Sequence, residues 1–188
     1  LEKVAREKAG IIKERIPVVI GETQLEVKDV FITLAAGRNA EICFADERFC
    51  CLLDKNININ GERRFEIEDL REKNRIAEVV PLGGDYQSRN LQTVLQACYI
   101  LRSQFNLSET RMTGGIRNTV INTGLQGRWQ ILGQKPLIVC DTGHNREGLE
   151  YVIRQISAIP KTGLHIVLGF VSDKDVGSIL PLFPAGAE

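Results

Sequence analysis

Polar side chains that could do chemistry gather in three glycine-containing stretches of the sequence. The first, Asp141-Thr142-Gly143-His144-Asn145, combines a carboxylate, a titratable imidazole and a glycine that allows close backbone approach. It lies between an apolar run typical of a strand and an amphipathic run typical of a helix, and exposed amides at a helix start favour an anion. The same spacing also fits Asp141 and Asn145 as simple helix caps.

The second stretch, Gly83-Gly84-Asp85-Tyr86-Gln87, follows an apolar segment that we expect to be a parallel strand, and it precedes a helical pattern. Asn90 lies one turn further on. A side-chain amide carries both a donor and an acceptor, which suits the edge of an adenine ring. No Gly-Lys-Ser/Thr follows, so the stretch is not a Walker loop. From spacing alone, a structural turn is the more frequent explanation.

The third stretch is Gly127-Arg128-Trp129, in a region rich in Thr, Gly, Asn and Gln. An arginine at a hinge can bind a phosphate through two parallel hydrogen bonds. A surface arginine on a linker is equally common, and spacing does not choose between the two.

Lys8 occupies an unexpected place in the pattern. It continues the helical face of Leu1, Val4 and Ala5, so we expect it to face inward. The alternative is a lysine whose stem lies along the helix while its ammonium reaches water. A cationic lysine cannot ligate a metal unless it is chemically modified.

The elements that must position these residues follow an α/β pattern. A helix over 1–9 precedes a βαβ unit made of a buried parallel strand at 17–21, a helical stripe closed by Gly37 and a strand at 40–44. Alternating residues over 48–70, with a hairpin turn at Asn60-Gly61, predict a small antiparallel meander with one wet face. The later elements are a helix with the stripe Leu91 to Cys98, a buried strand at 137–140, a helix with the stripe Leu149 to Ile156, and a buried strand at 164–170.

Composition excludes several classes of function. The 188 residues carry 24 Lys+Arg and 24 Asp+Glu, so no net charge attracts nucleic acid or an anionic membrane. No apolar run approaches the roughly 20 residues of a membrane span. Five cysteines without a C-x-x-C pair favour reduced, mostly buried thiols in a cytoplasmic protein. The ends, Leu1 and Glu188, are typical of a fragment of a longer chain.

Four motifs in order make the chain similar to the folylpolyglutamate synthase / dihydrofolate synthase family of the Mur ligase superfamily. Residues 7–13 match E-K-A-G-I-I-K, and residues 82–90 match L-x-G-x-[HY]-Q-x-x-N. Residues 141–148 resemble D-G-A-H-N-x-x-G, and Asp173-Lys174-Asp175 falls where D-K-D is usual. Two departures are Gln126 in place of the proline before Gly127-Arg128, and Thr142-Gly143 in place of Gly-Ala.

The resemblance implies ATP- and Mg²⁺-dependent ligation of L-glutamate to folate or dihydropteroate through an acyl phosphate. It implies that Asn90 contacts adenine, that Arg128 binds the phosphates and that Asp141 binds the ribose. Asp141 and His144 would also lie on the glutamate side, with His144 and Lys8 catalytic. Lys8 would be carbamylated, and its carboxylate would help to hold magnesium, which prefers oxygen ligands.

The expected fold is the rear part of a central ATPase domain over 1–125, a hinge linker over 126–135 and the start of a Rossmann-like C-terminal domain over 136–188. The phosphate-binding loop would lie upstream, so we expect the fragment to be inactive alone. We expect a monomer with small-molecule substrates and neither nucleic acid nor a membrane as partner. The alternatives are another Mur-type amino-acid ligase and a non-catalytic nucleotide-binding module.

Overall fold

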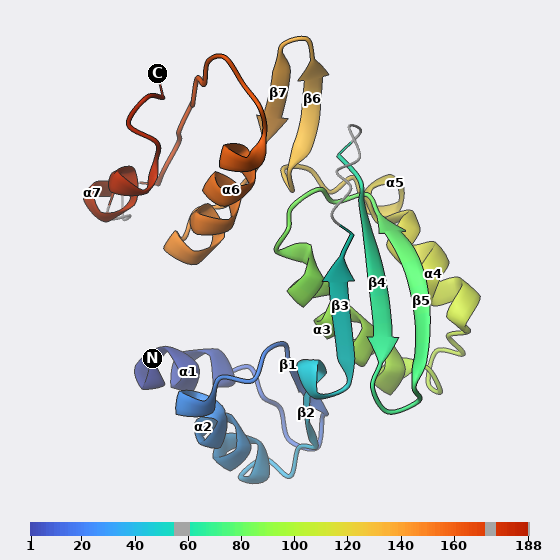
Figure 1. Ribbon diagram of the computed structural model, residues 1–188. Helices are drawn as coiled ribbons and strands as arrows, with labels where there is room; N and C mark the ends of the chain where they lie inside the picture. The colour runs from blue at the N-terminus through green and yellow to red at the C-terminus, as the bar shows by residue number, and fades with distance from the viewer. Residues whose placement is uncertain (55–60, 172–175, 188) are drawn as a thin grey trace.

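A parallel strand pair forms the first unit of the fold. In the computed structural model, which describes residues 1–54, 61–171 and 176–187, β1 (Val18–Ile20) pairs in parallel with β2 (Ile42–Phe44). Helix α2 (Leu25–Ala36) makes the crossover and packs against α1 (Glu2–Ala9) (Figure 1). The predicted βαβ unit is therefore confirmed, although its strand residues other than Phe44 are half-buried.

The predicted inward orientation of Lys8 is wrong. Helix α1 buries Ala5 and Ala9, which lie one turn apart, while Lys8 is exposed. Leu1 and Val4, which share the predicted face with Lys8, are 80% and 55% exposed. The small alanine side chains let α1 approach α2 closely, and this packing turns the Leu1-Val4-Lys8 face away from the cluster that α1 and α2 share.

The antiparallel meander is confirmed as a three-stranded sheet of β3 (Phe49–Leu53), β4 (Arg63–Asp69) and β5 (Asn74–Val80), with β4 in the centre. Helix α3 (Gln87–Leu101) covers its buried face, and the short helix η1 (Ala45–Glu47) leads into β3 (Figure 1). Phe65 at its centre is fully buried. The predicted strand residues 56–60, with the first half of the Asn60-Gly61 turn, lie outside the described residues.

The second glycine stretch follows an antiparallel strand. The sequence predicts a parallel strand before Gly83, because ligands gather at such strand ends, but the segment is the end of β5, which is antiparallel to β4. The stretch between 108 and 135 also holds more regular structure than its composition indicates: α4 (Glu109–Arg117), α5 (Thr119–Thr123) and β6 (Gln130–Gln134).

The C-terminal part begins as a hairpin. Strand β7 (Leu137–Cys140) forms where predicted, but it is antiparallel to β6 and partly exposed rather than buried. Helix α6 (Arg146–Ala158) follows, and α7 (Val176–Ile179) and η2 (Leu180–Leu182) end the fold. The buried strand predicted at 164–170 is not formed: within the described ranges no strand pairs with it, and Val167 is 100% exposed.

The chain is thus an α/β protein with small separate sheets (Figure 1). Over the described residues, no helix has the length and apolar character needed to cross a membrane. The five cysteines are free thiols, but only Cys51 is buried and the other four are half-buried, which corrects the expectation of mostly buried thiols.

Candidate functional site

The first and second glycine stretches meet in space although they lie far apart in the sequence. The Tyr86 hydroxyl donates to Oδ2 of Asp141 at 3.0 Å, across 55 residues of chain. The third stretch joins them, because the backbone N–H of Trp129 donates to the same Asp141 oxygen at 2.7 Å. We call residues 83–86, 127–129 and 141–144 together the junction.

Asp141 is the acceptor at the centre of the junction. Besides the bonds from Tyr86 and Trp129, its Oδ1 accepts from the N–H of Gly143 at 2.7 Å. Asp141 is therefore not a helix cap; Asn145 caps α6 and accepts from the N–H of Gly148 at 2.9 Å. Burial raises the pKa of the Tyr86 hydroxyl above its usual value, and the Asp141 charge raises it further. Tyr86 therefore stays a neutral donor to this carboxylate.

Arg128 lies where the hinge crosses the loop after β7. Its Nη1 donates to the Thr142 hydroxyl and, at 3.3 Å, to the Gly127 carbonyl. The backbone of Thr142 also bonds the Gly127 carbonyl at 2.9 Å. Gly127 has a φ of 68°, and a Cβ there would lie 2.4 Å from the Thr142 side chain. The positive φ and the close Thr142 side chain both favour glycine here, and the bond from the Thr142 N–H holds the hinge backbone beside Arg128 against the loop.

The Gly83–Asp85 turn is held from several sides. The Gly83 N–H donates to the Arg128 carbonyl at 3.1 Å, and Arg63 Nε donates to the Gly83 carbonyl at 2.9 Å. Arg63 also forms an ion pair of 2.5 Å with Asp85. Burial raises the pKa of Asp85, and the charges of Arg63 and Arg154 act in the opposite direction.

Two residues of this arrangement were not predicted. Gln155 on α6 bonds Gly83 and Asp85, and buried Arg63 on β4 bonds the same two residues. The available signal for Gln155 was its place one turn after Val152, on the flank of a helix face otherwise made of apolar side chains. Arg63 falls on the buried face of the alternating strand, where an arginine requires a partner.

The remaining predicted residues are less constrained. His144 is exposed, with Nδ1 at 3.2 Å from the Thr142 carbonyl, so it belongs to the junction. Asn90 lies one turn into α3, exposed, and donates to Gln87 at 2.9 Å. No hydrogen bond joins Lys8 to the junction among the described residues.

The described residues do not assemble a donor set for magnesium. Across residues 1–54, 61–171 and 176–187 there is no group of three or more His, Cys, Asp or Glu side chains able to hold a metal ion. Lys8 on its exposed helix is a cation and offers no oxygen unless it is carbamylated. The Asp173-Lys174-Asp175 motif lies outside the described residues.

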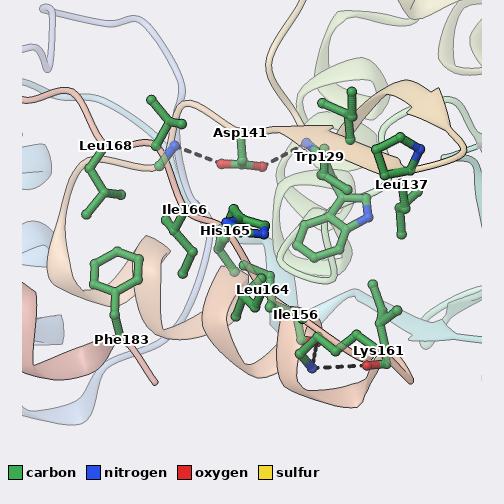
Figure 2. A pocket seen from close by; sticks show the side chains of 18 of the residues that line it. Trp129, Leu137, Asp141, Ile156, Lys161, Leu164, His165, Ile166, Leu168 and Phe183 are labelled. Atoms are coloured by element: carbon green, nitrogen blue, oxygen red, sulfur yellow. Dashed lines mark hydrogen bonds between the residues drawn. The ribbon is translucent and has the colours of Figure 1, made fainter. Parts of the chain in front are cut away.

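A cavity of about 710 Å³ adjoins the junction between β7, α6 and the segment 159–170. Figure 2 shows Asp141 and Trp129, joined by their hydrogen bond, among the side chains that line it. His165, which the sequence placed inside an apolar strand, lines the same cavity and is exposed.

Comparison with known proteins gives relatives that include folylpolyglutamate and dihydrofolate synthases. The chain is 29% identical over 178 residues to the folylpolyglutamate synthase of Lacticaseibacillus casei, covering 94% of this chain and 40% of that protein. It is 28% identical over 182 residues to the dihydrofolate synthase/folylpolyglutamate synthase of Escherichia coli, covering 95% and 38%. The chain therefore spans about 40% of the length of these curated relatives. No protein-family model matches it.

Solved structures agree with the sequence relatives. A complex of FPGS with AMPPCP and folate superposes with a TM-score of 0.79 at 26% identity, covering 96% of this chain and 44% of the other. The folylpolyglutamate synthase of Thermotoga maritima superposes with a TM-score of 0.74 at 27% identity, covering 100% and 42%. The chain is thus similar, in sequence and in fold, to a segment of the folylpolyglutamate and dihydrofolate synthases.

Proposed function

We propose that the chain supplies one side of an ATP site in an enzyme that ligates L-glutamate to folate or dihydropteroate. The junction carries this proposal, because it brings together two loops that match separate family motifs, with the arginine of the third stretch between them. The relatives named folylpolyglutamate synthase, and the solved complex with AMPPCP and folate, support it.

The junction has unused hydrogen-bonding capacity that suits a nucleotide. Asp141 accepts from three donors, and an ionised carboxylate has about four lone-pair sites, which leaves room for one ribose hydroxyl. Within the described ranges only Nη1 of the Arg128 guanidinium donates, so its other N–H groups can bind phosphate oxygens. Asn90 donates one amide hydrogen to Gln87, which leaves its other amide hydrogen and its amide oxygen for the adenine edge.

The proposed reaction has two steps. ATP transfers its γ-phosphoryl group to the carboxylate of the folate or dihydropteroate, and ADP leaves. The amine of glutamate then attacks the acyl phosphate, loses a proton and releases phosphate as the amide bond forms. Positioning and charge neutralisation dominate phosphoryl transfer, so Arg128 holds the phosphates while Asp141 and His144 face the glutamate side, where His144 supplies a titratable imidazole.

Magnesium, when bound, would neutralise phosphate charge in this reaction. The described residues do not form its site by themselves. We therefore assign this chain only one contribution, a carboxylate oxygen from carbamylated Lys8, and the other ligands to the part of such an enzyme that this chain does not cover. The fit depends entirely on that modification, because an unmodified ammonium repels the cation.

The same proposal extends to organisation. We assign residues 1–125 to the central ATP-binding domain, residues 126–135 to the hinge and residues 136–188 to the opening of the C-terminal domain. Strand β6 lies inside that hinge and pairs with β7, so the hinge is partly built into the C-terminal hairpin. We further propose a monomeric enzyme of the cytoplasm.

The test is a ligation assay on the full-length gene product. Glutamyl product is measured by mass spectrometry with dihydropteroate or folate as acceptor, with and without ATP. We expect Asp141→Asn to raise KM for ATP at least tenfold, and Asp29→Asn, on the exposed face of α2, to leave it unchanged. ATP binding without ligation of either acceptor would instead show a nucleotide-binding module, and ligation of a different acceptor would show another amino-acid ligase.

A further inference from the structure

Both polar atoms of the Gln155 side chain on α6 form hydrogen bonds with a turn some 70 residues earlier in the chain. Its Nε2 donates to the Gly83 carbonyl at 2.8 Å, and its Oε1 accepts from the Asp85 N–H at 3.0 Å. The side chain is 4% exposed. Only this orientation of the side-chain amide pairs its NH2 group with the Gly83 carbonyl and its oxygen with the Asp85 N–H. The flipped orientation would leave buried polar groups unpaired, which is costly.

The turn that Gln155 holds is the part of the junction that precedes Tyr86. Tyr86 follows Asp85 in the chain and donates to Asp141 at 3.0 Å. The ring of Tyr86 also meets Tyr151, one turn before Gln155 on α6, edge to face with ring centroids 6.5 Å apart. Helix α6 therefore contacts the turn through Gln155 and the next residue through Tyr151. A shift of α6 relative to the turn would move Tyr86 away from Asp141.

We propose that Gln155 is a positioning residue of the junction: its side-chain amide fixes the Gly83–Asp85 turn on α6 and, through that turn, holds the Tyr86 hydroxyl on Asp141. Gln155 itself does not touch Asp141. The contact joins the part of the chain before the hinge to the helix after it, so it also couples the two. The proposal concerns the conformation of this chain and does not depend on the proposed function.

Hydrogen exchange on the full 188-residue chain tests the proposal without any substrate. In Gln155→Met the side chain keeps its length and loses both hydrogen bonds. We expect the amides of Asp85, Trp129 and Gly143 to exchange at least tenfold faster. The last two bond Asp141 and not Gln155, so their response measures positioning rather than local loss of an acceptor. Amides of β4 should keep their protection.

Two further variants make the comparison specific. Gln104→Met makes the same chemical change at an exposed position and should alter none of these rates. Tyr86→Phe removes the bond to Asp141 downstream of Gln155, so Trp129 and Gly143 should exchange faster while Asp85 stays protected. If Gln155→Met does not fold, Gln155→Glu replaces it. Its carboxylate still accepts from Asp85 but cannot donate to Gly83, so for this variant faster exchange at Trp129 and Gly143 supports the proposal and unchanged exchange at both overturns it.

The pattern of rates decides the proposal. Faster exchange at Asp85 together with Trp129 and Gly143 supports it. Faster exchange confined to Asp85 would overturn it, because Gln155 would then act only as a local acceptor. Unchanged exchange at all three amides would overturn it as well.

Discussion

Alanine at Gly83 is expected to disturb the packing of the junction. A Cβ at this buried position would lie 2.7 Å from the Gly61 carbonyl oxygen, 2.7 Å from Trp129 Cδ1 and 3.0 Å from the Trp129 carbonyl oxygen. Two of these three atoms belong to backbone, which cannot rotate away. Gly114 in α4 is the matched control, since a Cβ there meets nothing within 4 Å.

The magnitudes follow from these contacts. Inserting a methyl group into a filled site typically costs about 1–3 kcal/mol, and backbone neighbours place Gly83→Ala near the upper end of that range. Gly114→Ala should instead stabilise by about 0.5–1 kcal/mol, because alanine loses less conformational freedom in a helix. The glycine-to-alanine change should therefore lower the free energy of unfolding at Gly83 and raise it at Gly114.

Urea denaturation measures both effects. Trp129 is the single tryptophan of the sequence and is 4% exposed, so its fluorescence reports unfolding at the junction. We expect the midpoint of Gly83→Ala to fall and that of Gly114→Ala to rise, with unchanged slopes. A Gly83→Ala chain as stable as the parent would refute the close packing of the Gly83–Asp85 turn on Trp129.

Three further predictions concern charge, thiols and the modified lysine. Burial alone would raise the pKa of Asp69, but hydrogen bonds from Arg48 and nearby amides lower it below its usual value. The ionised Asp69 therefore stabilises the fold fully above its unfolded pKa of about 4. This contribution is lost as the pH falls through the lower pKa of the folded state. Urea titrations between pH 6 and 2 should show a shallower acid loss of stability for Asp69→Asn, and equal slopes would contradict this. Burial raises the pKa of Cys51 to about 12, and the neighbouring Cys50 adds to the shift. Iodoacetamide at pH 8 should therefore alkylate Cys51 at least about a hundredfold more slowly in the native chain than in urea, as measured by peptide mass spectrometry. Equal alkylation rates would refute this. In the full-length gene product, Lys8→Ala should reduce ligase turnover with partial rescue by a short-chain carboxylic acid, and unchanged turnover would remove its metal role.

Local patterns in the sequence predict the elements well where one face of each is buried by its neighbours. The alternation of Phe65 and Ile67 with charged residues gives β4 correctly, and the stripe containing Leu91 and Leu95 gives α3. The prediction for Lys8 fails because the buried face of α1 is set by how closely its alanines approach α2, which periodicity cannot show. The predicted strand at 164–170 fails for a related reason, since a strand needs a pairing partner as well as apolar residues.

The site residues, too, are predicted only as far as local patterns in the sequence reach. Asp141 and Arg128 could be nominated because glycines mark the loops that carry them. Their convergence with Tyr86 depends on contacts 55 residues apart in sequence, which no local pattern contains. The sequence does not predict a role for Gln155, because a single polar residue beside an apolar stripe is common. Its role depends on hydrogen bonds to the Gly83–Asp85 turn, which is distant in sequence.

Photolabelling of the full-length gene product with 8-azido-ATP tests most directly whether the junction faces a nucleotide. The reactive group is on the adenine, which we place beside Asn90, and trypsin cleavage after Arg89 and Arg102 isolates Asn90 in one peptide. We predict that this peptide carries the label and that excess ATP abolishes it. Label that ATP displaces only from peptides outside residues 83–102 and 127–144 would contradict the account.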